Sequence, residues 1–131
     1  MIFVDTSAWF AYAVPNDSNH SRARKWDEVN ELPFVTTDYV IDELLTLMKA
    51  RDEYQRSISL GQQLFEGDLA RIEWVTKHDV HQALIIFSRF RDKGWSFTDC
   101  TSRVVMERLG IATAFAFDDH FRQFGNVAVA P

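Results

Sequence analysis

The chain has 131 residues, of which 47% are hydrophobic and 25% are charged; this excludes a disordered protein and predicts a single domain over residues 1–131. One cysteine excludes a disulfide framework, and the net charge of −5 argues against a protein that holds nucleic acid by net charge alone. No apolar run approaches the ~18 residues of a membrane span and no signal peptide is recognisable, so we expect a cytoplasmic protein without membrane contact.

Short apolar runs alternate with longer periodic segments along the chain. The apolar runs predict five strands, at residues 2–4, 33–37, 71–75, 113–117 and 127–129. Helical periodicity and capping residues predict six helices, at residues 8–14, 18–29, 38–51, 53–65, 79–90 and 99–109. Strands that alternate with helices favour parallel pairing with helices on both faces. The predicted fold class is therefore α/β, a three-layer α/β/α sandwich with a mainly parallel five-stranded sheet.

Four acidic residues fall where ligands of such a sheet bind, outside the carboxyl ends of the strands. Asp5 directly follows the first predicted strand, and Asp118 directly follows the fourth. Asp99 lies at the first position of the helix that Thr98 is expected to cap, and Glu43 lies about five residues into the helix after the second strand. Taken singly, each acid also fits a turn or a first helical turn. Together they predict a carboxylate cluster.

Glu43 is the acid that ordinary helix structure explains least well. On a helical wheel it lies at the border of the apolar face, between Tyr39 and Leu47, whereas Asp42 lies on the opposite, solvated face. A carboxylate at the border is drawn toward the interior and needs a partner. No Arg or Lys occurs three or four residues away to supply one. A cation shared with the other acids would supply such a partner.

A cluster of carboxylates has a restricted chemistry. Several negative charges a few ångströms apart repel, and some must protonate unless divalent cations lie between them. Sites built from oxygen ligands suit Mg²⁺ or Mn²⁺. Such ions stabilise both the attacking and the leaving oxygen in phosphodiester cleavage. The spacing of the acids therefore points to metal-assisted hydrolysis of phosphodiester bonds.

Four segments of the chain are similar to the motifs of the PIN-domain ribonucleases, in the same order and at similar spacing. They are VDTSAW at residues 4–9, TTDYVIDE at 36–43, SFTDC at 96–100 and AFDDHF at 116–121. Within that family the chain most resembles the compact VapC-type toxins of toxin–antitoxin pairs. The resemblance implies a PIN-like fold and an endoribonuclease that depends on Mg²⁺ or Mn²⁺.

The resemblance also assigns roles to individual residues. It implies that Asp5, Glu43, Asp99 and Asp118 are the catalytic and metal-binding acids. Asp5 and Asp99 are expected to be the main ligands, while Glu43 and Asp118 complete the cluster and orient water or a second ion. If the register of the fourth motif slips by one residue, Asp119 takes the place of Asp118.

Two hydroxyl groups follow the first acid, as they do in the family. Thr6 and Ser7 are interpreted as groups that position the phosphate or the acids, and helix capping explains them equally well. His120 lies close to the fourth motif, although a magnesium site does not need it as a ligand.

The expected partners follow from the resemblance alone. They are an RNA substrate, a cognate antitoxin protein and a second copy of the chain in a homodimer, with DNA contacted only indirectly through the antitoxin. Transfer RNA, ribosomal RNA loops and messenger RNA all fit the substrate expectation, and unpaired loops suit a recessed site.

Three other enzyme classes with acidic sites fit the sequence poorly. A receiver domain needs adjacent acids after the first strand and a lysine after the last, and a haloacid-dehalogenase phosphatase needs Asp-x-Asp at the first strand; Asp5-Thr6-Ser7 matches neither. A flap nuclease needs additional helices for which the chain has no room. The alternative from another class is a non-catalytic PIN-like binding module that acts through dimer and partner contacts.

A small basic cluster precedes the third motif. Arg89, Arg91 and Lys93 lie near the end of a predicted helix. Phosphate contact and favourable placement at a helix C-terminus explain these cations equally well.

Overall fold

A computed structural model describes all residues from 1 to 131. Its strands are β1 (Ile2–Val4), β2 (Phe34–Thr37), β3 (Arg71–Glu73), β4 (Thr113–Phe115) and β5 (Ala128–Ala130). Its α-helices are α1 (Thr6–Ala13), α2 (His20–Val29), α3 (Asp38–Ala50), α4 (Tyr54–Phe65), α5 (Lys77–Arg89) and α6 (Phe97–Leu109). A short 3₁₀ helix, η1 (Phe121–Phe124), precedes β5.

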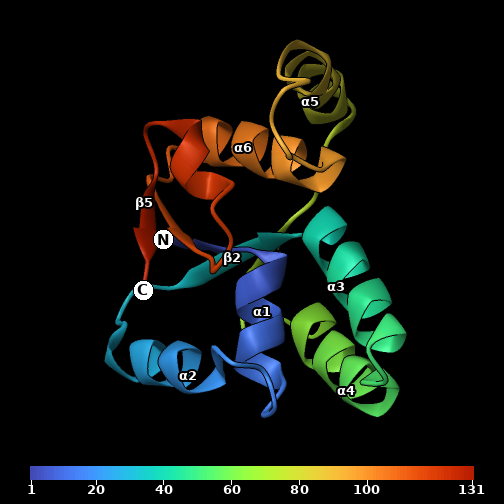
Figure 1. The fold of residues 1–131 in the computed structure, drawn as a ribbon, viewed down its shortest axis with the longest axis vertical. Coiled ribbons are helices and arrows are strands. Elements are labelled where there is room, and N and C mark those ends of the chain that lie inside the picture. Colours follow the sequence, from blue (N-terminus) through green and yellow to red (C-terminus); the bar gives the residue numbers. More distant parts are fainter.

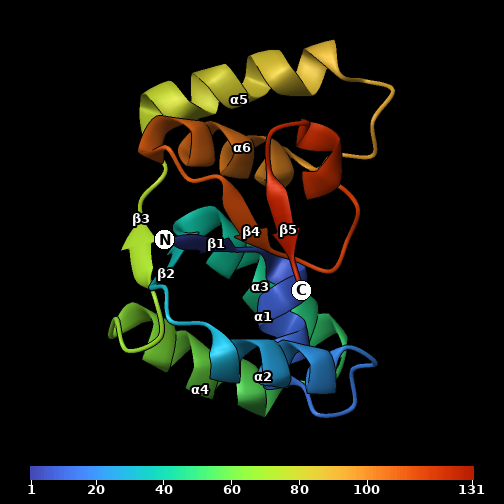
Figure 2. The same ribbon diagram turned by 90° about the vertical axis from the view of Figure 1, so that its left-hand side faces the viewer.

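The five strands form one parallel sheet in the order β3-β2-β1-β4-β5. Helices α1, α2 and α4 lie on one side of the sheet, and α3 packs against α1 and α4 (Figures 1 and 2). Helix α6 lies on the other side, and α5 packs against α6 from outside (Figure 2). The predicted α/β sandwich with a parallel five-stranded sheet is confirmed.

The central strands and the aromatic residues beside them form the core. All three residues of β1 are buried, as is Phe115 of β4. On the side of α1 and α2, Trp26 packs against Phe115 with 4.5 Å between ring centroids, and Trp9 packs edge-on against Phe34. These contacts hold the first two helices on the sheet, so that α1 begins at a defined point beyond β1. No helix in the structure is long and apolar enough to cross a membrane.

The structure corrects the start of α6. The predicted cap at Thr98 is wrong, because Ser96 caps the helix and Asp99 is its third residue, not its first. The Ser96 hydroxyl accepts a hydrogen bond from the Asp99 backbone N–H at 3.0 Å, and the Asp99 carboxylate accepts one from the Ser96 N–H at 2.9 Å. This reciprocal capping box pairs two backbone N–H groups that the helix itself leaves without partners.

The fourth strand is shorter than predicted. It ends at Phe115 rather than at residue 117, so two residues separate the strand from Asp118. Those two residues remain hydrogen-bonded to the neighbouring segments. The Ala116 N–H donates to the Ala130 carbonyl, and the Phe117 N–H donates to the Ser7 hydroxyl. Asp118 therefore lies beyond the carboxyl end of the strand, as the parallel topology requires.

An ion-pair network fixes α5 and α6 to the edge of the sheet. Arg108 of α6 donates to both carboxylate oxygens of Asp79, at 3.0 and 2.8 Å, and to Glu73 of β3 at 2.7 Å. Burial raises the pKa of Asp79, but its hydrogen bonds from Arg108 and Thr76 outweigh burial, so the net shift is downward. Hydrogen bonds from Arg71 and Arg108 lower the pKa of Glu73. The network sets the position of the α5–α6 pair, and Asp99 lies on its inner helix.

Candidate active site

Asp5 is the N-cap of α1 and lies at the end of β1. Its carboxylate accepts hydrogen bonds from the Ser7 hydroxyl at 2.9 Å and from the Ser7 backbone N–H at 3.3 Å. The residue is only 1% exposed. The unpaired N–H groups at the start of α1 favour a negative charge here. The side chain of Asp5 therefore caps the helix and, in the same position, supplies a carboxylate to the candidate site.

Ser7 connects the ends of two neighbouring strands. β1 pairs with β4, with Val4 opposite Phe115. Beyond that pair, the Ser7 hydroxyl donates to Asp5 and accepts the backbone N–H of Phe117 at 3.0 Å. Since Phe117 immediately precedes Asp118, this one hydroxyl sets the spacing between the first and fourth acidic motifs.

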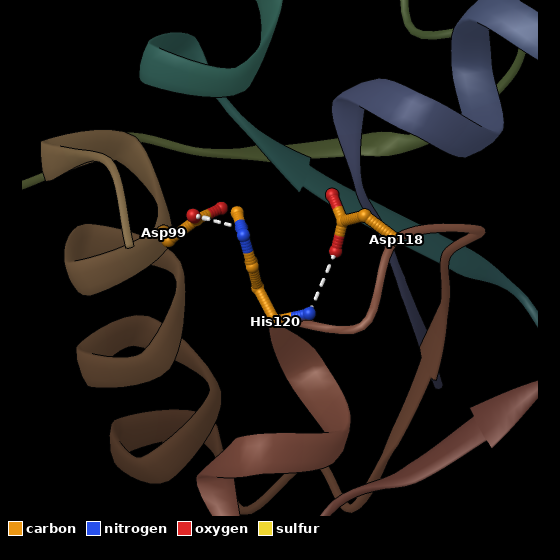
Figure 3. Close-up of side chains that lie close together, drawn as sticks. All are labelled: Asp99, Asp118 and His120. Atoms are coloured by element: carbon orange, nitrogen blue, oxygen red, sulfur yellow. Dashed lines mark hydrogen bonds and ion pairs between the residues drawn. The ribbon is translucent and has the colours of Figure 1, made fainter. Parts of the chain in front are cut away.

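Asp99 reaches the same edge from the other helical layer. Its carboxylate completes the capping box of α6 and also lies 2.7 Å from Nδ1 of His120 (Figure 3). Asp118 lies on the loop after β4, where its carboxylate accepts the His120 backbone N–H at 3.1 Å (Figure 3). One ligand atom from each of Asp99, Asp118 and His120 lies within 4.8 Å of the others.

The electrostatics show that three of the acids act on one another. Burial raises the pKa of the Asp5 carboxyl well above its usual value, the negative charges of Asp118 and Asp99 raise it further, and the hydrogen bond from Ser7 opposes them. Burial also raises the pKa of Asp99, while the Ser96 N–H and His120 oppose it. Both shifts mean that the ionised carboxylates need a positive charge between them at neutral pH.

The structure separates Asp118 from its neighbour Asp119. The side chain of Asp119 is 87% exposed and lies 3.8 Å from Arg122, directed away from the cluster. Asp118 is instead one of the charges that raise the pKa of both Asp5 and Asp99. The geometry therefore places Asp118, and not Asp119, at the acidic site.

Glu43 is not in the group formed by Asp99, Asp118 and His120. It is half-buried on α3. Four residues earlier, Tyr39 packs against Phe97 of α6, with 6.4 Å between ring centroids. Residues four apart lie on the same face of a helix, so Glu43 occupies the face of α3 that turns toward α6.

The residues present fit a divalent cation. Carboxylates from three separate segments converge, with Asp5 and Asp99 buried and Asp118 half-buried, and the positive helix N-termini compensate their charge only in part. Beside Asp5, the buried hydroxyl of Thr6 has no hydrogen-bond partner. Carboxylate oxygen ligands suit Mg²⁺ and Mn²⁺. Asp5, Asp99 and Asp118 would hold such an ion.

Two connections in the site were not predicted from the sequence. The first is the hydrogen bond between His120 and Asp99, and the second is the bridge from Ser7 to Phe117. The hydrogen bond between His120 and Asp99 had one signal in the sequence, which is that His120 lies close to the fourth motif. Nothing in the sequence signals the second, because it joins residues 110 positions apart.

Comparison with known proteins shows the family. The model of the PIN domain matches residues 2–127, so the chain belongs to the PIN-domain family. It is 33% identical over 131 residues to the 23S rRNA-specific endonuclease VapC20 of Mycobacterium tuberculosis, with 100% of this chain and 99% of the relative covered. The chain is a VapC-type member of the PIN-domain ribonucleases, as its four motifs indicated.

Solved structures agree with this assignment. The crystal structure of M. tuberculosis VapC20, described as a toxin that cleaves the sarcin-ricin loop, matches with a TM-score of 0.92 and 31% identity over 100% of both chains. FitAcB from Neisseria gonorrhoeae matches with a TM-score of 0.71 and 17% identity, over 100% of this chain and 97% of that one. The latter likeness supports the fold alone.

Proposed function

We propose that this protein is an endoribonuclease that hydrolyses phosphodiester bonds of RNA with Mg²⁺ or Mn²⁺ held by its carboxylates. The observation that carries the proposal is the convergence of buried Asp5 and Asp99 with Asp118, and the upward pKa shifts of the first two. Burying several carboxylates close together lowers the stability of the fold, and a protein that only binds partners has no need for such a cluster. It is the arrangement that metal-assisted phosphodiester hydrolysis requires.

Each residue of the site contributes to the geometry of that reaction. When bound, the ion supplies Lewis-acid chemistry that stabilises the negative charge developing on the phosphate. Asp5 is held in place by Ser7, and Asp99 is held by the Ser96 N–H and His120. Asp118 is held by the His120 backbone N–H. Fixed carboxylates lose little conformational freedom when the ion and substrate bind.

We assign Glu43 as the fourth carboxylate, at the outer side of the site. Its support is its half-buried position on the face of α3 that turns toward α6. Because it does not raise the pKa of Asp5 or Asp99 as Asp118 does, its replacement should reduce activity less than that of Asp5.

The proposed substrate is an unpaired loop of large ribosomal RNA. The support is the name and structure of the VapC20 relative, which covers the whole chain. We further propose that the protein acts in the cytoplasm as a homodimer and is inhibited by a cognate antitoxin. DNA is contacted only indirectly, through the antitoxin. These last proposals rest on membership of the VapC-type group.

The experiment is cleavage of purified ribosomal RNA, with Mg²⁺ or Mn²⁺ compared with EDTA. Discrete fragments should appear only with the metal, and Asp5→Asn or Asp118→Asn should abolish them. Asp119→Asn is the matched control for Asp118→Asn, because it removes the adjacent charge from outside the cluster. If folded, antitoxin-free protein cleaves nothing, or if cleavage survives Asp5→Asn, the nuclease is wrong and the binding module takes its place.

A further inference from the structure

A cavity of about 570 Å³ lies at the end of α5 and along the connection to α6. Its walls include the aromatic side chains of Phe87, Phe90 and Trp95 and the basic side chains of Arg91 and Lys93. This volume lies within the range of pockets that bind small organic ligands.

The cavity adjoins the acidic site through Gly94. Gly94 lines the cavity, and a Cβ atom at that position would lie 3.5 Å from Nε2 of His120. The other ring nitrogen of His120 is the one that lies 2.7 Å from Asp99. The imidazole ring of His120 therefore connects the glycine at the wall of the cavity to the carboxylate of Asp99.

The cations of the cavity are available to a ligand. Arg91 forms no ion pair, and Lys93 is paired only with its neighbour Asp92, at a loose 3.9 Å. Both residues are exposed. In a chain of net charge −5, these two exposed cations form a local positive patch. Positive charge here attracts a phosphate that the acids themselves repel.

The aromatic wall is rigid on its inner side and open on its outer side. Trp95 is held by its indole N–H, which donates to Gln123 at 2.9 Å, and it packs against Phe90 at 5.1 Å between ring centroids. Phe87 packs edge-on against Phe97 and remains 45% exposed. A ring that is 45% exposed has surface free for a base, and such stacking accepts every base.

We infer that this cavity is a subsite for one unpaired nucleotide next to the scissile phosphate, with the base against Phe87 and the backbone phosphate bound by Arg91 and Lys93. The inference rests on the proposed function, since it concerns the RNA that the acidic site cleaves. A pocket of this size takes a single splayed-out nucleotide, not a double helix. It therefore selects unpaired RNA.

RNA binding measured without cleavage tests the subsite. In an Asp5→Asn background, fluorescence anisotropy with a labelled single-stranded oligonucleotide reports affinity at several salt concentrations. Arg91→Ala with Lys93→Ala should weaken binding ~10-fold and lower the slope of log affinity against log salt by about 0.7, the contribution of one phosphate contact on a single strand. Arg89→Ala is the matched control, because it removes an exposed cation of α5 that does not line the cavity.

The stacking contact has its own pair of variants. Phe87→Ala should weaken binding roughly 5- to 100-fold, the range expected for loss of one base–aromatic stack. Phe87→Tyr keeps the ring and should restore the affinity. In the cleaving protein, the same changes should raise KM and leave kcat within about twofold, because they remove binding of the flanking nucleotide rather than the acids.

The results separate this inference from the proposed nuclease. If the double variant of Arg91 and Lys93 keeps the parental affinity, salt slope and KM while cleavage still needs Asp5, the subsite is wrong and the nuclease stands. If the protein cleaves no RNA but its RNA binding depends on Arg91 and Lys93, the nuclease is wrong and the cavity is an RNA-binding site without a scissile phosphate. Loss of antitoxin binding with RNA binding unchanged would make the cavity a peptide site and overturn the inference.

Discussion

Replacing Asp5 with Asn should stabilise the metal-free protein while it abolishes cleavage. Asn has nearly the same shape and still accepts the hydrogen bond from the Ser7 hydroxyl. The amide carries no negative charge, so the repulsion from Asp118 and Asp99 is removed. The substitution therefore removes a repulsion and keeps the local structure.

The size of the gain follows from the burial and charge of the site. Asp5 is 1% exposed, and its pKa is raised by burial first and by Asp118 and Asp99 next. A buried polar group with incomplete compensation costs on the order of 1–3 kcal/mol. For a chain of this size, each kcal/mol corresponds to roughly 3–5 °C in Tm. We expect Asp5→Asn to raise the Tm in EDTA by roughly 3–15 °C.

The pH dependence of this gain has a definite sign. A carboxyl whose pKa is higher in the folded than in the unfolded protein stabilises the fold when protonated and loses that contribution as pH rises through the folded value. The difference in stability between Asp5→Asn and the parent protein should therefore be small near pH 4. It should grow as the pH rises and level off above the folded pKa of Asp5.

Thermal unfolding followed by circular dichroism measures these differences, in EDTA and in Mn²⁺. The parent should gain stability in Mn²⁺, by ~2.7 kcal/mol at a hundredfold excess over Kd, and Asp5→Asn should gain far less. Asp42→Asn, an exposed acid without a hydrogen bond, is the control and should change stability by less than ~0.5 kcal/mol. A lower Tm for Asp5→Asn than for the parent in EDTA would refute the electrostatic reasoning.

Three further predictions concern the frame of the site. Arg108→Ala should lower the free energy of unfolding in urea by about 3–5 kcal/mol, because it leaves the fully buried carboxylate of Asp79 unpaired. Since the pKa of Asp79 is lowered in the fold, this loss should shrink as the pH falls below the usual value of 3.8. An unchanged loss at low pH would contradict this cause. His120→Ala should reduce kcat or Mn²⁺ affinity about 10- to 100-fold with little change in Tm, because it releases Asp99, and parental values of both would contradict that role. Gly110→Ala should lower the free energy of unfolding by about 1 kcal/mol, because φ is +67° at this helix end, and a gain in stability would argue against strain.

Local patterns in the sequence predicted most of the elements correctly. The alternation of short apolar runs with periodic segments indicated five strands and six helices, because periodicity and capping depend on residues a few positions apart. The errors are the ends of elements and the short 3₁₀ helix η1, which was not predicted. At α6, Thr98 and Ser96 are both capping residues, and only the reciprocal hydrogen bonds with Asp99 decide that Ser96 caps the helix.

The candidate acids could also be chosen from the sequence, but not their arrangement. The order of strands places β1 beside β4, and this brings Asp5 next to the segment that carries Asp118. The direction of the chain after Phe117 then decides that Asp118 faces the cluster and Asp119 faces solvent. A sequence pattern that holds two adjacent aspartates contains no information about which of them turns inward.

The sequence by itself determined that this is a parallel α/β protein with acids at the carboxyl ends of its strands. Only the tertiary structure decided that Asp5, Asp99 and Asp118 lie near enough for their charges to act on one another, that His120 binds Asp99, and that Gly94 lies beside His120. The physical reason is distance along the chain. Helices, strands and caps depend on contacts between near neighbours, whereas the charge repulsion and burial that define the site arise between residues that chain folding brings together from far apart.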